Sequence, residues 1–429
     1  MSMFVLFGVM FFLLFIGVPI GISLALSMFA LLAVHPVTTP EFIAQSMYSG
    51  VASFTMLALP FFILAGNIMD TGGISKRIVN VANSLIGNVV GGLGMVTIVA
   101  CMFFGAISGS APATVAAIGA IMIPQMIKAG YDKYYAAGLI AVAGGLGVIV
   151  PPSYPLVIYG VTNNVSIGTL FIAGIGPAII VGLVLMIFNY FYSKKRGYMG
   201  SGEAFSPRKA LKAFWSAKAA LFMPVIILGG IYGGIFTATE AAVVSVVYGI
   251  VVGVFVYREI TFKKLFTLFK DSVAFIGGMM FTFAPAAAMG AVFSYLGIQK
   301  LVGAFFLGIS TNYYVVLLLI FILLTIVGMF VQTTPAIVIL SPILLAVVVQ
   351  VGVNPVHFGI IMTLALAIAF VTPPVASNLF VAMTMTGLSM MEIVRVAVPF
   401  IIGLFIALFI CGYLPETSLF ILRMLDIPF

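Results

Sequence analysis

Two proline pairs interrupt long apolar stretches of the chain, and each would expose backbone oxygens that can bind a cation. GGLGVIVPPSYP occupies residues 144–155, and ALAIAFVTPPVASN occupies residues 365–378. Proline has no amide hydrogen, so a proline pair leaves the carbonyls one helical turn earlier without their usual donors. In membrane transporters, carbonyls of unwound helices coordinate coupling cations such as sodium. The two breaks therefore predict two oxygen-rich cation sites.

Two small polar turns inside other apolar stretches would supply hydroxyl ligands to the same sites. ISGSAPAT covers 107–114, and VQTTPAIV covers 331–338. We predict that each turn faces one break, so that hydroxyl and carbonyl oxygens coordinate the same cation. The first site joins Ser108 and Ser110 to carbonyls near Gly145 and Val148, and the second joins Thr333 and Thr334 to carbonyls near Ala367 and Phe370.

The half-helices that start after the two breaks would direct their N-termini into the membrane interior. A helix N-terminus carries a partial positive charge and unpaired amide hydrogens, which favour an anion. Polar side chains lie at these positions and at the first polar turn. The residues predicted to bind an anionic substrate are Ser110, Ser153, Thr372, Ser377 and Asn378.

Few groups in the chain could carry protons at membrane depth, where acids, lysines and histidines mark proton relays. Of the ten Asp and Glu residues, Asp70 and Glu240 come closest to an apolar span, and both lie at its end. His35 and His357 lie at span edges, where we interpret them as interfacial residues. We therefore predict sodium as the coupling ion and no other cofactor, with proton coupling as the alternative.

The composition is that of a polytopic membrane protein. Hydrophobic residues make up 63% of the 429 residues and charged residues 7%, whereas soluble proteins are about 25% charged. The mean hydropathy is +1.32. The net charge of +8 arises from basic residues in short loops between apolar stretches, which membrane topology explains better than nucleic-acid binding. The expected surroundings are a lipid bilayer, with no nucleic-acid partner.

Apolar runs of about 17–25 residues can cross a bilayer. Two longer stretches, 92–128 and 312–350, are interrupted by the polar turns, so each is predicted to form a re-entrant hairpin of two half-length helices. The amphipathic segments 74–87 and 297–308 are predicted to be helices in the membrane interface. The predicted spans are 3–34, 51–70, 132–164, 168–193, 217–234, 238–257, 272–295, 355–386 and 392–414.

The distribution of positive charge predicts the orientation. With the N-terminus in the cytoplasm and both hairpins re-entrant, every Lys and Arg except Lys300 and Arg423 falls on the cytoplasmic side. This asymmetry is what the positive-inside rule requires. Counting either hairpin as a full crossing would scatter the basic clusters over both faces. The long polar segment 194–216 is then a cytoplasmic linker between two halves.

Landmarks of the first half recur in the second half with nearly one offset. The proline pairs differ by 222 residues (373 − 151), and the prolines of the polar turns differ by 223 (335 − 112). An even number of predicted spans precedes the linker, so the extra span 217–234 starts the second repeat from the opposite face. Inverted repeats with broken helices indicate a secondary transporter. The predicted organisation is a first repeat at 1–193 with scaffold helices at 3–70, a linker and connecting span at 194–234, and a second repeat at 235–429.

At these motifs the chain resembles the large membrane subunit of tripartite ATP-independent periplasmic (TRAP) transporters, over essentially its whole length. The resemblance implies an elevator-type, sodium-driven importer of the bacterial inner membrane, in which a transport domain moves against a scaffold. It also implies two separate partner chains, a small four-helix membrane subunit and a periplasmic substrate-binding protein. The stretches that carry the resemblance are LPFFILAGNIMDTGGIS (59–75), FGAISGSAPATVAAIG (104–119), IVPPSYPLVIYG (149–160), GIFTATEAAVVSVVYG (234–249) and GMFVQTTPAIVILSPILLAV (328–347).

The resemblance further implies an organic-acid substrate and specific sodium ligands. Overall similarity favours a sialic-acid-type sugar acid over a C4-dicarboxylate. One position departs from the family pattern, because Gln332 stands where an acidic residue is frequent, so no sodium or substrate role is transferred to it. The implied sodium sites are Ser108, Ser110, Gly145, Val148 and Pro151 for the first, and Thr333, Thr334, Ala367, Phe370 and Pro373 for the second.

Two other classes of membrane protein fit the sequence less well. A membrane enzyme such as an intramembrane protease needs a zinc motif, a serine with a histidine at membrane depth, or paired membrane aspartates, which two histidines at span edges do not supply. A channel would not need a paired, inverted site. The P-loop pattern G-x-x-x-x-G-K-[ST] is absent from the sequence, which excludes ATP hydrolysis by that route.

Overall fold

The computed structural model describes residues 2–36, 38–200 and 206–429, which fold into helices and connecting turns. Residues 201–205, at the centre of the predicted linker, lie outside the described residues. Within the described part, ten helices are long and apolar enough to cross a membrane. The predicted fold class, an all-α polytopic membrane protein, is confirmed.

Most predicted spans are helices close to the predicted bounds. Two helices begin earlier than the apolar run alone indicated, because their first turns are basic: α12 covers Pro207–Tyr232 and α14 covers Phe262–Tyr295. Ser206 caps the first of these helices and Thr261 the second, and such caps fix where a helix starts. The other spans of this kind are α4 (Ala58–Thr71), α11 (Ile167–Arg196), α13 (Ala238–Ile250, continued by the π-helical turn η2 over Val251–Val256) and α20 (Met390–Tyr413).

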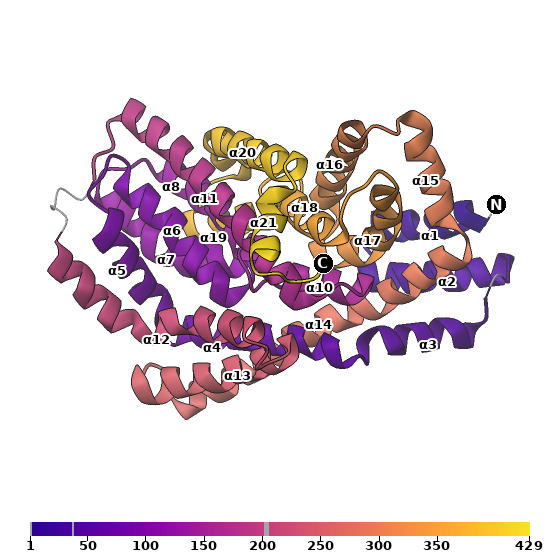
Figure 1. The fold of residues 1–429 in the computed structure, drawn as a ribbon, viewed down its shortest axis with the longest axis horizontal. Helices are drawn as coiled ribbons and strands as arrows, with labels where there is room; N and C mark the ends of the chain where they lie inside the picture. The colour runs from indigo at the N-terminus through magenta and orange to yellow at the C-terminus, as the bar shows by residue number, and fades with distance from the viewer. Residues whose placement is uncertain (1, 37, 201–205) are drawn as a thin grey trace.

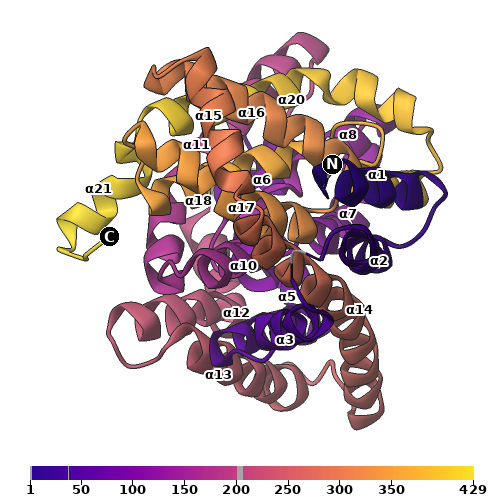
Figure 2. The ribbon, with the colours of Figure 1, turned by 90° about the vertical axis from the view of Figure 1, so that its right-hand side faces the viewer.

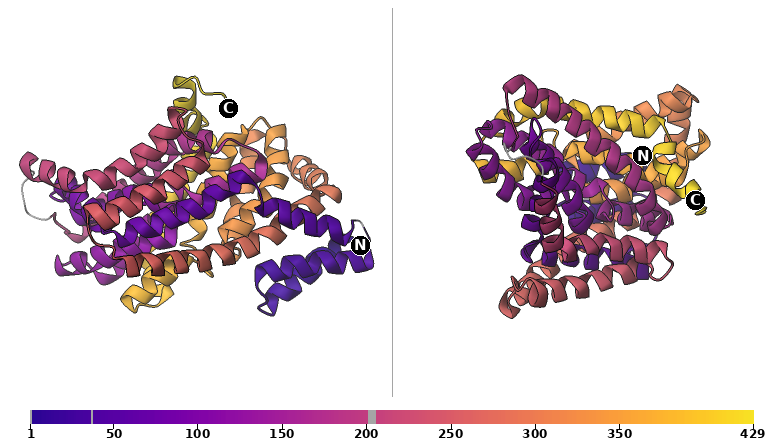
Figure 3. Two further views of the ribbon diagram at one scale, coloured as in Figure 1. Left: turned by 90° about the horizontal axis from the view of Figure 1, so that it is seen from below. Right: turned by 60° about the vertical axis from the view of Figure 1, so that its left-hand side comes forward.

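The single span predicted at 3–34 is wrong. The chain forms two helices there, α1 (Ser2–Phe15) and α2 (Ile20–Val34), which pack on each other as a hairpin at one end of the molecule (Figure 3). Gly17, with a φ of +85°, and Pro19 separate them. Both ends of a hairpin lie on the same side, so the crossing that placed the N-terminus in the cytoplasm is lost. The orientation of the N-terminus stays a prediction.

Both polar turns join two helices, as predicted, and the re-entrant placement of these pairs in the membrane stays a prediction. The first consists of α6 (Gly92–Ser108) and α7 (Ala111–Lys128). At its tip Gly109 has a φ of +62°, which favours glycine, and the Ser110 side chain accepts a hydrogen bond from the Ala113 amide. The second consists of α16 (Tyr313–Phe330) and α17 (Thr333–Gln350), joined by two residues.

Both proline pairs break a helix where the sequence predicted. In the first repeat, α8 (Lys133–Ala143) and the short α9 (Leu146–Ile149) precede the break, and α10 (Tyr154–Asn163) follows it. In the second repeat, α18 (Pro355–Ala369) precedes the break and α19 (Ser377–Thr386) follows it. Both Pro-Pro peptide bonds are cis.

The two repeats exchange their half-helices. The half-helix α10 of the first repeat packs on α17 of the second, and α19 of the second repeat packs on α7 and α8 of the first. Figure 1 shows α19 beside α7, and α10 near α17. The α18 helix also packs on α9, next to the first break. The exchange brings both breaks and both hairpin tips to one region of the molecule.

A layer of long helices lies along one side of the hairpins, and Figure 2 shows its members α3 (Pro40–Val51), α13 and α14 below α16 and α18. In this layer α4 packs on α13 and α14, and α14 packs on α2 and α3. The turn η1 (Phe54–Leu57) connects α3 to α4. The short helices α5 (Ile74–Ile86) and α15 (Ile298–Ile309) join the layer to the two hairpins, and α21 (Glu416–Met424) follows α20.

The order of elements changes the boundary of the second repeat. Since α2 packs on α14 as α13 packs on α4, the α1–α2 pair corresponds to the α12–α13 pair. This correspondence assigns α12 to the second repeat, in line with the prediction that the span 217–234 starts it, so the predicted boundary at residue 235 falls after this helix. The predicted linker is also mostly helical, because α11 ends at Arg196 and α12 begins at Pro207.

Substituting Gly105 by alanine should destabilise the fold, because the first hairpin and the first break touch there backbone to backbone. A β-carbon at Gly105 would lie 2.8 Å from the Gly147 Cα and 3.0 Å from the Leu146 carbonyl oxygen. Overpacking of this kind costs about 1–3 kcal/mol, so the unfolding temperature of Gly105→Ala in detergent should fall by several degrees. Gly8→Ala is the matched control, since nothing lies within 4 Å of its new carbon. Equal unfolding temperatures for both variants would contradict this packing.

Candidate functional site

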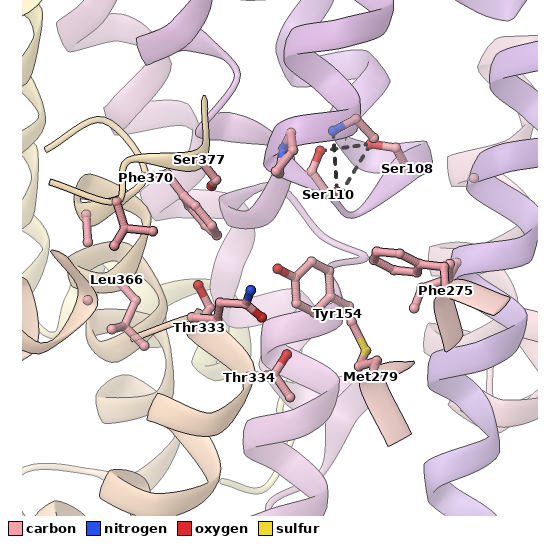
Figure 4. A pocket seen from close by; sticks show the side chains of 18 of the residues that line it. Ser108, Ser110, Tyr154, Phe275, Met279, Thr333, Thr334, Leu366, Phe370 and Ser377 are labelled. Atoms are coloured by element: carbon pink, nitrogen blue, oxygen red, sulfur yellow. Dashed lines mark hydrogen bonds between the residues drawn. The ribbon is translucent and has the colours of Figure 1, made fainter. Parts of the chain in front are cut away.

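A cavity of about 460 Å³ lies where the two hairpin tips, the two breaks and the long-helix layer meet. Figure 4 shows Tyr154 between the first tip, with Ser108 and Ser110, and the second tip, with Thr333 and Thr334. The layer contributes residues of α4 and α14 to the opposite wall. Six residues predicted as ligands line this cavity together: Ser108, Ser110, Thr333, Thr334, Phe370 and Ser377.

The N-termini of four helices open onto this cavity. The lining includes the first residues of α10, α17 and α19 at Tyr154, Thr333 and Ser377, and of α7 at Pro112 and Ala113. Each N-terminus carries roughly half a positive charge and amide hydrogens without helical partners. Four such ends around one space create a site for negative charge without a basic side chain.

The first tip is held in shape by its own hydroxyls. The Thr114 hydroxyl donates to the Ser110 carbonyl at 2.7 Å, and it lies 3.1 Å from the Ser108 hydroxyl. The Ser108 hydroxyl is also 3.4 Å from the Ser110 carbonyl oxygen. A β-carbon at Gly147 would lie 2.5 Å from that same carbonyl oxygen, so the tip sits directly against the first break. Thr114 was not among the predicted ligands, although it lies one helical turn after Ser110.

The segments that precede the two breaks lie close to each other. A β-carbon at Gly145 would lie 3.1 Å from the Val142 carbonyl oxygen and 3.8 Å from the Ala367 carbonyl oxygen of the other repeat. The predicted carbonyls are not all free, however. The Gly145 carbonyl accepts from the Val148 amide at 3.2 Å, and the Ala367 carbonyl accepts from the Phe370 amide at 3.3 Å. A carbonyl has a second lone pair, so each can still bind a cation.

Polar groups around the two breaks are partly occupied, and eight predicted ligands do not line the cavity. The Phe370 carbonyl accepts from the Asn378 amide at 3.1 Å. The ring of Pro151 is turned toward α11, because a β-carbon at Gly174 would lie 2.7 Å from its Cγ. The Thr372 hydroxyl donates to the Ile368 carbonyl at 2.9 Å. Gly145, Val148, Pro151, Ala367, Pro373, Ser153, Thr372 and Asn378 are not among the residues that line the cavity.

Three of the residues predicted to bind substrate carry buried polar atoms without a hydrogen-bond partner. These atoms are the hydroxyls of Ser153 and Ser377 and the Oδ1 oxygen of Asn378. The amide nitrogen of the Asn378 side chain donates to the Ala141 carbonyl at 2.9 Å, which fixes the direction of Oδ1. Buried polar groups are nearly always paired, so unpaired oxygens beside four helix N-termini indicate a place for a ligand.

The long-helix layer supplies cavity residues that the sequence analysis did not select. They include Asn67 and Asp70 of α4 and Asp271, Phe275 and Met279 of α14. Tyr154, the first residue of α10, is a further lining residue that was not selected. Asp271 precedes the predicted span 272–295, so an acid at a span end was a usable signal. His357, by contrast, lies outside the lining and is buried, with its ring nitrogens 3.2 Å from the Ser418 hydroxyl and 3.2 Å from the Gly412 carbonyl oxygen.

Removing the hydroxyl of Ser153 should not weaken the fold, whereas removing that of Thr114 should. The Ser153 hydroxyl has no partner, so Ser153→Ala loses no hydrogen bond. Thr114→Val deletes the bond to the Ser110 carbonyl, which costs about 1–3 kcal/mol when the acceptor stays buried. Thermal unfolding without substrate should give an equal or higher midpoint for Ser153→Ala and a lower one for Thr114→Val. The reverse order would show that the hydroxyl of Ser153 is structurally paired.

Comparison with known proteins identifies related chains. The family model described as "Tripartite ATP-independent periplasmic transporter, DctM component" matches residues 7–417. The sialic acid TRAP transporter large permease protein SiaM of Vibrio cholerae is 39% identical over 407 residues, covering 95% of this chain and 95% of SiaM. The C4-dicarboxylate TRAP transporter large permease protein DctM of the same organism is 37% identical, covering 94% and 93%.

Two further matches extend this comparison. The isethionate TRAP transporter permease protein DctMQ of Oleidesulfovibrio alaskensis is 43% identical over 416 residues, which are 97% of this chain and 66% of that longer protein. Among solved structures, the YdaH transporter of Alcanivorax borkumensis, whose crystal structure is described as revealing an unusual topology, superposes with a TM-score of 0.65. That match covers 87% of this chain and 88% of the other at 14% identity, so it bears on the fold alone.

Proposed function

Because this chain belongs to the DctM component family of tripartite ATP-independent periplasmic transporters, we propose that it imports an organic anion together with sodium across the bacterial inner membrane. The family makes it a membrane permease and not an enzyme. Its relatives are named for isethionate, sialic acid and C4-dicarboxylates, all of which are organic anions. We retain a sialic-acid-type sugar acid as the favoured substrate over a dicarboxylate.

One observation carries this proposal: both hairpin tips and four helix N-termini surround a single cavity. An anion in that cavity would face four partial positive charges. Near these helix ends are the unpaired oxygens of Ser153, Ser377 and Asn378. Discontinuous helices arranged in this way around an anionic substrate are typical of secondary transporters.

Sodium would bind behind the tips, where carbonyl and hydroxyl oxygens concentrate. We propose one site formed by the first tip and the first break, and a second formed by the second tip and the second break, with the ligands named above. Support comes from the contact of the first tip with Gly147 and from the approach of Gly145 to the Ala367 carbonyl. A sodium ion at each site would tie a tip to a break and would shape the cavity for the anion.

We propose an elevator movement in which the hairpins and broken helices slide along the long-helix layer. Helix α5 would stay with the layer, because Arg77 pairs with Glu259 at 2.6 Å and its guanidinium lies 3.7 Å from the centre of the Tyr257 ring. The loop after η2 carries both partners. Glycines with positive φ stand where the layer would meet the moving part, Gly91 between α5 and α6 and Gly297 before α15, and they would act as pivots.

The proposed partners follow from the tripartite family. They are a small four-helix membrane subunit, which would enlarge the static layer, and a periplasmic binding protein that delivers the substrate. We propose that the basic ends of α11 and α12, with Lys194–Arg196 and Arg208–Lys212, face the cytoplasm, as the positive-inside rule predicts. The organic anion and the surrounding bilayer complete the expected set of partners.

Proton coupling remains the second candidate, because two carboxylates line the cavity. Asp70 and Asp271 both belong to the wall that faces the hairpin tips. Acidic groups that reach a transport cavity can carry protons. Sodium coupling is preferred, since the tips themselves offer hydroxyls and carbonyls and no acid.

Uptake should require an inward sodium gradient. The experiment uses proteoliposomes that contain this chain, its small membrane partner and the cognate binding protein, with labelled organic anion outside. We expect accumulation with sodium outside and potassium inside, and none with potassium on both sides. Accumulation driven by a proton gradient in sodium-free buffer would favour the second candidate.

Loss of one hydroxyl at either tip should weaken the response to sodium. For Ser110→Ala and Thr334→Ala we expect the sodium concentration for half-maximal uptake to rise roughly tenfold, which corresponds to about 1.4 kcal/mol. Thr267→Ala is the control, because its hydroxyl is exposed on α14 and does not line the cavity. If both tip variants titrate like the control, the proposed sodium sites are wrong.

A further inference from the structure

The cavity has opposite electrostatic character at its two walls. The wall made by the tips and breaks holds four helix N-termini and a set of hydroxyls. Helices α4 and α14 contribute Asp70 and Asp271, which are both exposed residues of the lining. The first tip packs on α4 at Gly66, where a β-carbon would lie 2.9 Å from the Ser108 Cα. Among the described residues no lysine, arginine or histidine lines the cavity. The positive end is therefore built from dipoles, and the negative end from full charges.

The two acids belong to one patch of the long-helix layer. The Asn67 side-chain amide donates to the Ser272 hydroxyl at 2.9 Å, which joins α4 to α14 beside both acids. Asp70 follows Asn67 by three residues, about one helical turn, and Asp271 is adjacent to Ser272. Asp70 also accepts a hydrogen bond from the Ser75 hydroxyl at 2.9 Å. The patch consequently presents carboxylate oxygens that accept hydrogen bonds from a ligand.

Neighbouring lysines on α14 do not cancel this negative charge inside the cavity. Lys270 is next to Asp271 in sequence, and successive helix residues point about 100° apart. Lys264 lies on the same face about 10 Å further along the axis, where it is exposed to solvent and screened by salt. Neither lysine is among the lining residues.

From this polarity we infer that the substrate is a monoanion that carries hydroxyl groups at the end remote from its acidic group, and that dicarboxylates are disfavoured. The inference rests on the proposed function and specifies its substrate class. The acidic group would lie at the helix N-termini, and the hydroxyls would donate to Asp70 and Asp271. Hydroxy acids and hydroxy sulfonates have this form.

A dicarboxylate would place its second carboxylate against the acidic wall. The second carboxylate would be repelled by Asp70 and Asp271, and water in a partly hydrated cavity would screen this repulsion only in part. Sodium ions at the proposed sites would not remove the repulsion, because both sites lie behind the tips, on the other wall. Gln332 at the second tip is a neutral hydrogen-bonding side chain in the lining, so it adds no charge to either end.

The preference for a monoanion is tested by ligand binding to the permease and its small membrane partner in lipid nanodiscs, in sodium buffer. The binding protein is left out, because its own selectivity would mask that of the permease. The monoanionic probes are isethionate, gluconate and N-acetylneuraminate, and the dianionic probes are succinate and L-malate. Malate also carries a hydroxyl, so it separates the effect of charge from that of hydrogen bonding. Each probe is titrated while the unfolding temperature is measured.

At least one monoanion should stabilise the complex at a concentration at least about tenfold below that of either dicarboxylate. In Asp271→Asn this ratio should shrink at least about threefold, the low end of the Coulomb estimate for a hydrated cavity. Asp426→Asn makes the same exchange at the exposed C-terminal end, outside the cavity, and should leave the ratio unchanged.

The outcomes separate this inference from the proposed function. Succinate or malate binding as tightly as the best monoanion would overturn the inference and leave sodium-coupled anion transport intact. An unchanged ratio in Asp271→Asn would equally overturn it. If no anion of either class stabilises the complex in sodium, the proposed function fails and the inference fails with it.

Discussion

The fold depends on one constraint: backbone polar groups at membrane depth must find partners within the protein. Each proline pair breaks this condition, and contacts with neighbouring elements of the same or the other repeat help to restore it. The Asn378 side chain of α19 donates to the Ala141 carbonyl of α8 at 2.9 Å, and the Val375 amide donates to the Met329 carbonyl of α16 at 3.2 Å. The exchanged half-helix α19 therefore helps to stabilise the first break, and the hairpin of its own repeat helps to stabilise the second.

Near the cavity, some buried polar groups have no hydrogen-bond partner. Ser153, Ser377 and the Asn378 Oδ1 keep unpaired buried oxygens, and four helices direct their N-termini to the cavity that Ser377 lines. Three of the unpaired buried atoms are ones that a ligand would use, whereas the hydroxyls of Thr162 and Tyr232 are unpaired elsewhere in the fold. Leaving those three atoms unpaired costs folding free energy, and the same atoms would bind the proposed ligands.

The helices on the other side of the cavity have no breaks. They are the continuous helices α4 and α14, whose backbones are satisfied internally, so the character of this wall comes from side chains such as Asp70 and Asp271. A wall without breaks can remain rigid while the broken elements change position. The acidic patch would then stay fixed, and the dipolar site would travel past it.

The sequence by itself determined the element types, the two hairpins, the two breaks and six of the cavity residues, because proline, glycine and hydroxyl residues act locally on a helix. It did not reveal that residues 3–34 form two helices, since hydropathy does not distinguish a short apolar turn at Gly17–Pro19 from a continuous span. Tertiary structure alone decided which half-helix packs on which hairpin and that Asp271 lines the same cavity as the tips. These features depend on contacts between segments up to about half the chain apart, and no local pattern encodes such contacts.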